Sequence, residues 1–533
     1  MKKILSTIAF AVIVFLSGCD VLDLGPIDYA ASGNYWKNEA QVESEYYGIM
    51  GQLRGSYSYP FVLGEVRGGT LKQNATIEGV STSYQTIARN ALSKDDTGVS
   101  NWAGYYGRIL QVNNFIEQVR DHCEFLDDAG RNKWLARAYG IRAYYYFMLY
   151  RTYGGVPLED DVVLFKTNNL EEYYKARSGA ADIMAFLKEE IARSESAFGS
   201  DRSVDAHAWN YYATEMLKAQ IHLWAAKVTT DDGIGKYTAS GEKDLTVAKT
   251  ALQNVLSGPF QLLDDYASIF SADNKGNKEE ILALFFSKDE TTNAGTQFVY
   301  QAAIWCNSFY DEAGNLLGDP LDLKGGGMHR DEYIESFVKS FDKTDQRRAA
   351  TFHECYSSAD PADRVFGSAV LKYMGHAEGS NRYYDSDVIL FRFSDAVLMM
   401  AEVENGLGNQ SAAANYINQI RKRAYGANYN SSVEFKAAGK AETELAILKE
   451  RDKEFVAEGT RWFDLVRMQD ASGNPLAFSA AAAYPATLGG TATPVLSSSE
   501  RYKLLWPIDV NVKNGDKLIY DPANGIDQQN PGY

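Results

Sequence analysis

Apolar residues recur along most of the chain at three- and four-residue steps, the spacing that places them on one face of an α-helix. Between Trp134 and Tyr150 the sequence reads WLARAYGIRAYYYFMLY, a broad aliphatic and aromatic stripe, and Asn210 to Lys227 repeats the pattern. Both segments are predicted to be helices that bury one face. The run Gly154 to Pro157 ends the first, because proline cannot continue a helix.

Two further helices are predicted at residues 393–407 and 412–425. Only Gly408 to Ser411 separate them, so we expect an antiparallel αα-hairpin. Similar hairpins are expected near residues 105–150 and 180–228. The predicted fold class is therefore mostly α, with tetratricopeptide-like helical hairpins as a scaffold, although no clean repeat of about 34 residues is visible.

Residues 271–380 depart from this helical pattern. The stretch is rich in Gly, Asp and Asn, and its scattered aromatic residues follow no helical period. Long irregular insertions in a folded protein tend to carry function. We expect these loops to carry a ligand face.

The first nineteen residues, MKKILSTIAFAVIVFLSGC, have two lysines before an apolar run too short to cross a bilayer. Residues 1–18 are interpreted as a signal peptide. The ending Leu16-Ser17-Gly18-Cys19 resembles a bacterial lipobox, in which Cys19 is acylated and anchors the mature chain to a membrane. The alternative is an ordinary signal peptide cleaved nearby, with Cys19 an incidental thiol.

The composition narrows the classes of partner. The formal net charge is −17 and no Lys/Arg run supplies a basic face, so nucleic acid is not expected as a partner. Four cysteines are too few for a disulfide scaffold of 533 residues, and Cys123, Cys306 and Cys355 are interpreted as buried apolar side chains. Aromatic residues make up 13% of the chain, a surplus that belongs either to the core or to a surface that binds something flat and apolar.

No enzyme motif is present: there is no Gly-rich phosphate loop, HExxH, CxxC pair or Gly-x-Ser-x-Gly elbow, and the six histidines are widely spread. Glu454 and Glu458 could suggest an acid–base pair. They recur with Arg451, Arg461 and Asp464 at three- and four-residue steps, which favours a charged network that locks a helix end. We expect no catalytic residue and no metal ligand.

The same region resembles a known family. The segments at 451–459 and 461–467, the ending Trp506-Pro507-Ile508, and the last five residues Gln-Asn-Pro-Gly-Tyr are similar to C-terminal elements of the SusD/RagB family of Bacteroidetes outer-membrane lipoproteins. Arg142 to Leu158 resembles its N-terminal half. Asp452 and Lys453 stand where the family usually has arginines, and Asp509 where proline is usual.

This resemblance implies a cell-surface lipoprotein that captures oligosaccharides and delivers them to a SusC-type TonB-dependent transporter, without performing chemistry. In the RagB branch the ligand is a peptide, and that alternative stays open. The implied organisation is a signal peptide at 1–18, an N-terminal SusD-like half at 19–230 and a C-terminal half at 231–533. Two less favoured alternatives are an exported glycoside hydrolase, which needs two carboxyl groups in an aromatic cleft, and a scaffold without a small ligand.

Sugar binding requires aromatic planes for the apolar ring face and amide or charged groups for the hydroxyls. Aromatic rings on helical stripes are occupied in packing, which excludes Trp134, Trp209, Trp224 and Trp462. The candidates lie in irregular segments. They are Trp305, Phe309 and Tyr310 in the insertion, Trp102 with Asn101, and Tyr84.

The oxygen-rich stretches 311–322 and 516–527 offer ligands for a structural Ca²⁺. Neither follows the EF-hand spacing. We therefore expect solvated turns there and no cofactor.

Overall fold

The computed structural model describes residues 35–73, 84–98, 102–162, 169–300 and 307–533. Its α-helices in these ranges are α2 (Glu39–Arg54), α3 (Tyr59–Gly64), α4 (Gln85–Ala88), α5 (Ala103–Asp121), α6 (Asp128–Tyr153), α7 (Ala180–Phe198), α8 (Tyr211–Lys227), α9 (Glu242–Leu256), α11 (Glu335–Val338), α12 (Gln346–Thr351), α13 (Phe393–Gly406), α14 (Gln410–Tyr425), α15 (Lys440–Glu454), α16 (Arg461–Arg467) and α17 (Val510–Gly515).

The described strands are short and form two-stranded antiparallel sheets. They are β1 (Thr230–Asp231) with β2 (Lys236–Tyr237), β3 (Glu280–Leu284) with β8 (Val388–Arg392), β4 (Phe352–Tyr356) with β5 (Phe366–Val370), β6 (His376–Glu378) with β7 (Asn381–Tyr383), and β9 (Tyr520–Asp521) with β10 (Ile526–Asp527).

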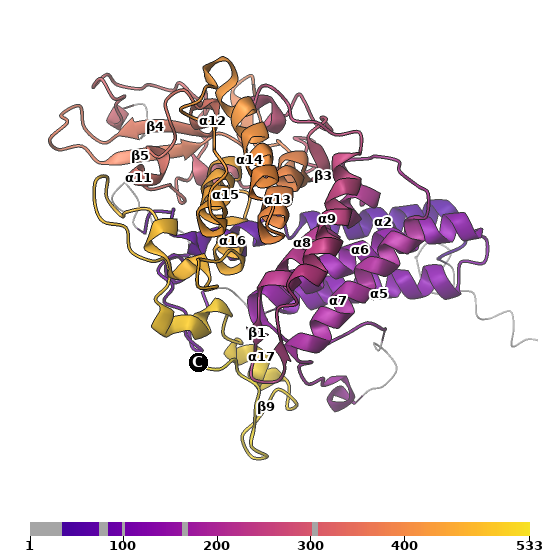
Figure 1. Cartoon of the computed structure of the whole chain (residues 1–533). Coiled ribbons are helices and arrows are strands. Elements are labelled where there is room, and N and C mark those ends of the chain that lie inside the picture. Colours follow the sequence, from indigo (N-terminus) through magenta and orange to yellow (C-terminus); the bar gives the residue numbers. More distant parts are fainter. Residues whose placement is uncertain (1–34, 74–83, 99–101, 163–168, 301–306) are drawn as a thin grey trace, which may run out of the picture.

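The long helices pack in a continuous series. Helix α2 contacts α5, α5 contacts α6, and contacts continue through α7, α8 and α9 to α13, which packs against α14 and α15. Figure 1 shows α5 to α9 side by side, with α13 to α16 continuing the stack and β4 and β5 at the opposite end. The predicted class is confirmed: the molecule is mostly helical, and hairpins form its scaffold.

Helix α6 lies in the middle of this series, and its burial is wider than predicted. The sequence indicated one apolar face, but nearly every side chain from Trp134 to Tyr153 is buried. Neighbouring helices α5, α7 and α8 cover the other faces. Gly140 marks one close contact: a Cβ there would lie 2.0 Å from Nε1 of Trp209.

The predicted hairpin at 393–425 is confirmed, since α13 and α14 pack against each other across a three-residue connection. The start of α8 also follows its sequence. Asn210 caps that helix by accepting a hydrogen bond from the backbone N–H of Ala213 at 3.0 Å. The four tryptophans assigned to helical packing are buried, as are the free thiols Cys123 and Cys355; Cys306 lies outside the described residues.

The stretch 271–380 is the least helical part, as predicted, but it is more ordered than a set of loops. Strands β4 and β5 pair from Phe352–Val370 to Tyr356–Phe366. A small separate core fills the space beside them and includes Val299, Tyr300, Phe309, Leu323, Cys355, Ala369 and Tyr384. This core explains how a segment without helical periodicity holds a fixed shape.

The motifs in the C-terminal half act as scaffold. Glu454 is fully buried and contacts Arg347, Arg392 and Arg423, which confirms the predicted charged network at the end of α15. Near the C-terminus, the Asn530 amide donates to the backbone oxygens of Tyr153 and Trp506 at 2.9 and 2.7 Å.

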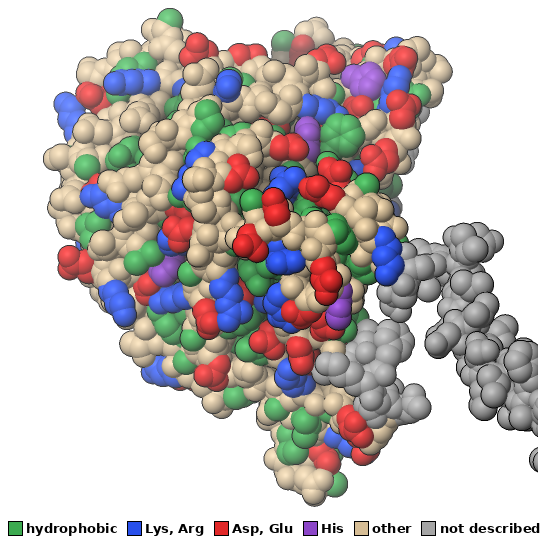
Figure 2. All heavy atoms as spheres, turned by 90° about the vertical axis from the view of Figure 1, so that its right-hand side faces the viewer, with side chains coloured by type: hydrophobic (Ala, Val, Ile, Leu, Met, Phe, Trp, Pro, Cys, Tyr) green, Lys and Arg blue, Asp and Glu red, His purple; other side chains and the backbone are tan. Residues whose placement is uncertain are grey.

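On the face shown in Figure 2, acidic and basic side chains are interspersed.

Candidate functional site

One face of α6 lines a cavity in the interior of the helical stack. Tyr144, Phe147, Met148 and Arg151 follow at three- and four-residue steps and therefore point to the same side of the helix. The cavity has a volume of about 110 Å³. Its floor is thus set by the register of one buried helix.

The opposite walls come from segments far apart in the sequence. Strand β8 contributes Val388 to Phe391, the start of α3 contributes Pro60 and Phe61, and the turn between α15 and α16 contributes residues 457–460. Helix α3 and this turn approach backbone to backbone, because a Cβ on Gly64 would lie 1.9 Å from the backbone oxygen of Gly459. Gly459 also has φ +77°, a conformation that favours glycine.

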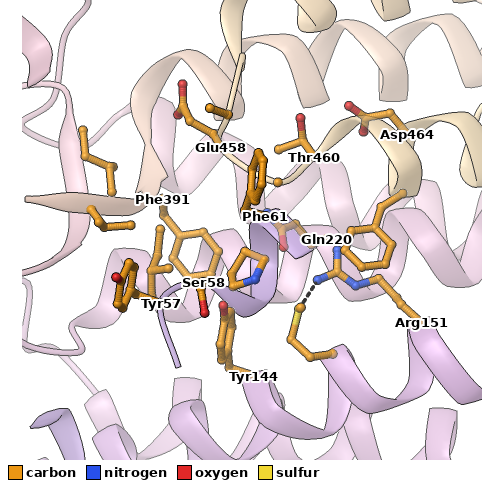
Figure 3. Close-up of a pocket in the computed structure, with 18 of the residues that line it drawn as sticks. Tyr57, Ser58, Phe61, Tyr144, Arg151, Gln220, Phe391, Glu458, Thr460 and Asp464 are labelled. Atoms are coloured by element: carbon orange, nitrogen blue, oxygen red, sulfur yellow. Dashed lines mark hydrogen bonds between the residues drawn. The ribbon is translucent and has the colours of Figure 1, made fainter. Parts of the chain in front are cut away.

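Half-buried rings mark the side on which the cavity approaches the surface. Tyr57, Phe61 and Tyr84 are all half-buried and line it, beside residues 293–298 of the chain. Phe61 packs edge-on against Phe298 with ring centroids 5.2 Å apart. The deeper rings, such as Phe391, are buried. Figure 3 shows Tyr57, Phe61, Tyr144 and Phe391 around the central space.

Polar groups also reach the cavity. Arg151, Gln220 and Thr460 line it and keep part of their surface exposed, so they offer hydrogen-bond donors and acceptors between the aromatic walls. Burial raises the pKa of Tyr144 to about 12, so its hydroxyl remains protonated at neutral pH. Burial likewise lowers the pKa of Arg151 to about 10, which leaves the guanidinium cationic.

The carboxylates of the wall are already paired. Asp464 bonds to Arg451 and Arg467, each at 2.7 Å. Glu458 bonds to Lys372 and Arg392, at 2.5 and 2.7 Å. These carboxylates therefore hold the structure around the cavity together.

Comparison with known proteins identifies the architecture. A family model described as SusD family matches residues 354–533, and one described as "Starch-binding associating with outer membrane" matches residues 38–213. The crystal structure of a SusD superfamily protein from Bacteroides fragilis is 35% identical, covering 94% of this chain and 100% of that chain with a TM-score of 0.84. This chain belongs to the SusD family.

Other relatives agree. The structure of B. fragilis NanU is 29% identical, covers 96% of this chain and 100% of that chain, and has a TM-score of 0.79. SusD-like protein P38 of Formosa agariphila is 24% identical over 491 residues, which is 88% of this chain and 93% of that protein. None of the described helices combines the length and apolar character needed to cross a membrane.

The two SusD-family matches meet at the cavity. Its lining from Tyr57 to Arg151 belongs to the N-terminal match, whereas Tyr373 and the residues from Val388 to Arg467 belong to the C-terminal match. The cavity is therefore a feature of the whole fold, which neither half builds alone.

Of the predicted binding residues that the structure describes, Tyr84 alone lines this cavity. Tyr310 is half-buried, pairs with Leu316 and Tyr356 in isolated β-bridges, and does not line the cavity. Trp305, Asn101 and Cys19 lie outside the described residues.

For two predicted rings the expected exposure is wrong. Phe309 is 2% exposed because it packs against Tyr300, with centroids 4.5 Å apart, in the small core of the insertion. Trp102 is 6% exposed because Tyr106 and Tyr153 pack edge-on against it. Trp102 does line a separate cavity with Tyr106 and Leu110. A role of either residue in ligand binding stays a prediction.

Sequence reasoning missed the residues of α6 and α3. Tyr144 and Arg151 lie in a segment that the sequence predicts to be a packing helix, so neither was a candidate ligand contact. Phe61 had no distinguishing pattern. The one available signal was the spacing of Tyr144, Phe147, Met148 and Arg151, a stripe that places an arginine in line with apolar residues.

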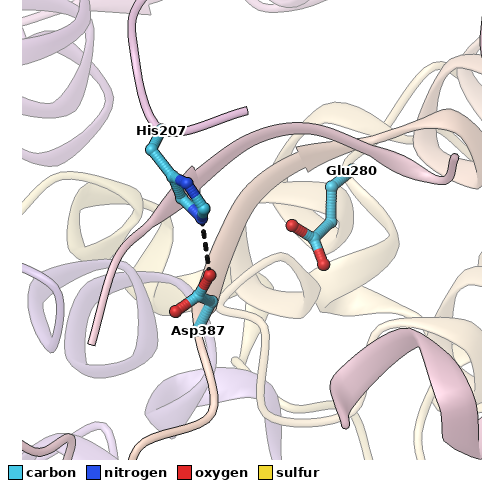
Figure 4. A group of neighbouring side chains, drawn as sticks. All are labelled: His207, Glu280 and Asp387. Atoms are coloured by element: carbon cyan, nitrogen blue, oxygen red, sulfur yellow. Dashed lines mark hydrogen bonds and ion pairs between the residues drawn. The ribbon is translucent and has the colours of Figure 1, made fainter. Parts of the chain in front are cut away.

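A second cluster of polar side chains lies near the β3–β8 pair. His207, Glu280 and Asp387 place one ligand atom each within 4.8 Å of one another, and Figure 4 shows His207 bonded to Asp387. That bond is 2.7 Å long, and Nζ of Lys275 lies 3.4 Å from the other oxygen of Asp387. Burial raises the pKa of Glu280 to about 7. Protein groups thus already partner these carboxylates.

Proposed function

We propose that this SusD-family protein captures oligosaccharides at the cell surface and delivers them to a SusC-type TonB-dependent transporter in the outer membrane, without performing chemistry. The observation that carries the proposal is the cavity described above, whose aromatic walls are interrupted by half-buried polar groups. The family description as starch-binding and associated with the outer membrane supports it.

The entrance matches the chemistry of a sugar. A pyranose ring presents a face of C–H groups that stacks on aromatic planes, and half-buried Tyr57, Phe61 and Tyr84 supply such planes. Gln297 and Gln220 offer amides for the hydroxyls. Trp305, which follows the lining residue Phe298 by seven positions, and Asn101, Tyr310 and Trp102 remain predicted contacts.

Catalysis is not part of the proposal. A glycoside hydrolase needs one carboxyl group to give a proton to the leaving group and a second to act as base or nucleophile. The lining carboxylates Glu458 and Asp464 are each held by two cationic side chains instead. This arrangement favours a structural role for both carboxylates.

Attachment to the membrane is proposed to occur through Cys19. At about 0.8 kcal/mol per buried methylene group, two or more acyl chains give stable anchoring where one does not. The chain would then be tethered beside the transporter that receives the ligand. Incorporation of labelled palmitate into wild-type protein, and its loss in Cys19→Ala, tests the anchor.

The binding function is tested by calorimetry and affinity gel electrophoresis with neutral and acidic oligosaccharides and with peptides. Phe61→Ala and Tyr84→Ala should weaken glycan binding by roughly tenfold, the size expected for a lost ring contact of about 1.4 kcal/mol. Tyr47→Ala is the matched control, because Tyr47 is 56% exposed on α2. Heat release with peptides alone would contradict the glycan assignment and favour a peptide ligand.

A further inference from the structure

Arg151 stands out among the charged groups of the cavity. The wall contains three arginines, and Arg451 and Arg467 each bind two carboxylates, which are Asp395, Asp464 and Glu402. Arg151 has no carboxylate partner within 4 Å among the described residues. It also lines a second cavity of about 290 Å³, on the side of Lys227 and Arg501.

The contacts of Arg151 fix its position without neutralising it. Its guanidinium lies 4.2 Å from the ring centroid of Phe147 and 3.9 Å from that of Phe463, so two aromatic rings hold the cationic group. Among the residues that the structure describes, its one hydrogen bond goes from Nη2 to the sulfur of Met148 at 2.7 Å, and none of them bonds to the buried Nε. In Figure 3 the guanidinium points toward the middle of the cavity.

A partly buried charge without a counter-ion is less stable than a paired one, and the neighbouring carboxylates are not free to pair with Arg151. Asp464, a carboxylate whose charge acts to raise the pKa of Arg151, has one oxygen on Arg451 and the other on Arg467. A positive group that the protein holds in place and leaves unpaired is suited to an anion brought from outside. The planar fork of arginine matches a carboxylate in particular.

We propose that Arg151 binds the carboxylate of a sugar acid, so that the captured glycan carries an acidic sugar. This inference rests on the proposed glycan-binding function. The carboxylate is the ring substituent of a hexuronate or the C1 group of a ulosonic acid. Gln220 and the Tyr144 hydroxyl line the same cavity and supply hydrogen bonds for the sugar hydroxyls. The net charge of −17 disfavours long polyanions, which points to an isolated acidic sugar.

The test is calorimetry with the full mature chain and matched probes: oligosaccharides ending in glucuronate, galacturonate or a ulosonic acid, their methyl esters, and their neutral counterparts. Each acid should bind wild-type protein at least about tenfold more tightly than its ester, because only the acid forms a charge-assisted pair. Arg151→Gln should remove this preference, so that the variant binds acid and ester with equal affinity, and Arg151→Lys should keep part of it. The control is Arg120→Gln, since Arg120 is exposed and pairs with Asp121.

The outcomes separate the two proposals. Equal affinity of wild-type protein for acid and ester overturns the role of Arg151, and this measurement needs no variant to fold. Binding of acids that survives Arg151→Gln also overturns it. If neutral glycans bind while acids do not, glycan capture stands and the acidic specificity fails. If no glycan binds, both proposals fail, and a preference for carboxylated peptides overturns the sugar assignment.

Discussion

Replacing Glu454 with Gln tests whether the motif at the end of α15 is scaffold. Glu454 is 0% exposed and contacts Arg392 at 2.7 Å and Arg347 at 3.1 Å, as well as Arg423. Although burial raises the pKa of this carboxyl, the guanidiniums of Arg423, Arg392 and Arg347 outweigh burial and hold it well below its ordinary value. The ionised form is therefore the one the fold requires.

The magnitude follows from charge balance. Ion pairs around Glu454 connect five carboxylates with five cations, namely Glu279, Asp345, Glu450, Glu454 and Glu458 with Arg347, Lys372, Arg392, Arg421 and Arg423. Glu454→Gln leaves one buried positive charge in excess. Removing one partner from a buried ion pair costs about 3–5 kcal/mol, and we expect a loss of that size in the free energy of unfolding.

The assay is urea unfolding followed by tryptophan fluorescence and circular dichroism. Glu442→Gln on the exposed first turn of α15 is the control and should change stability by less than about 0.5 kcal/mol. The double variant Glu454→Gln/Arg423→Gln restores the balance, so its loss should fall short of the sum of the single losses by at least about 1 kcal/mol. A loss below about 1 kcal/mol for Glu454→Gln, or strict additivity, would refute the reasoning.

Two further predictions concern stability. Burial raises the pKa of Glu65 from 4.5 to about 7. Between these pH values the folded state keeps a proton that the unfolded state releases, so the free energy of unfolding falls as the pH rises. Glu65→Gln should flatten this dependence on pH in thermal melts from pH 4 to 9, and an unchanged dependence would contradict the prediction. Gly140→Ala should lower the free energy of unfolding by about 1–3 kcal/mol, because its Cβ would meet Trp209. Gly48→Ala is the control and should not lower it, since the space around Gly48 is open. Equal melting temperatures for the two variants would contradict this explanation.

Helical elements could be predicted from the sequence because their signals are local. The spacing of apolar residues marked α6 and α8, and the break at Gly408 to Ser411 marked the connection between α13 and α14. The network around Glu454 was also predictable in kind, since charges of both signs recur at helical steps. Its partners Arg347, Arg392 and Arg423 were not, because they come from other elements.

The exposure of loop aromatics could not be predicted in the same way. Phe309 and Trp102 stand in segments without period, and both rings are buried by residues distant in sequence, such as Tyr300 and Tyr153. The cavity has the same origin. Several helices, strand β8 and the turn between α15 and α16 form it together, so Arg151 looks like part of a packing stripe until the opposite walls are known.

The most direct test of the account is a crystal structure of the protein with the tightest-binding oligosaccharide from the affinity screen. We predict a sugar ring against Phe61 and Tyr84, with its polar groups directed toward Gln220 and Arg151. A complex in which this cavity is empty and the sugar occupies the cavity beside Trp102, or the surface near Tyr310, would contradict the assignment.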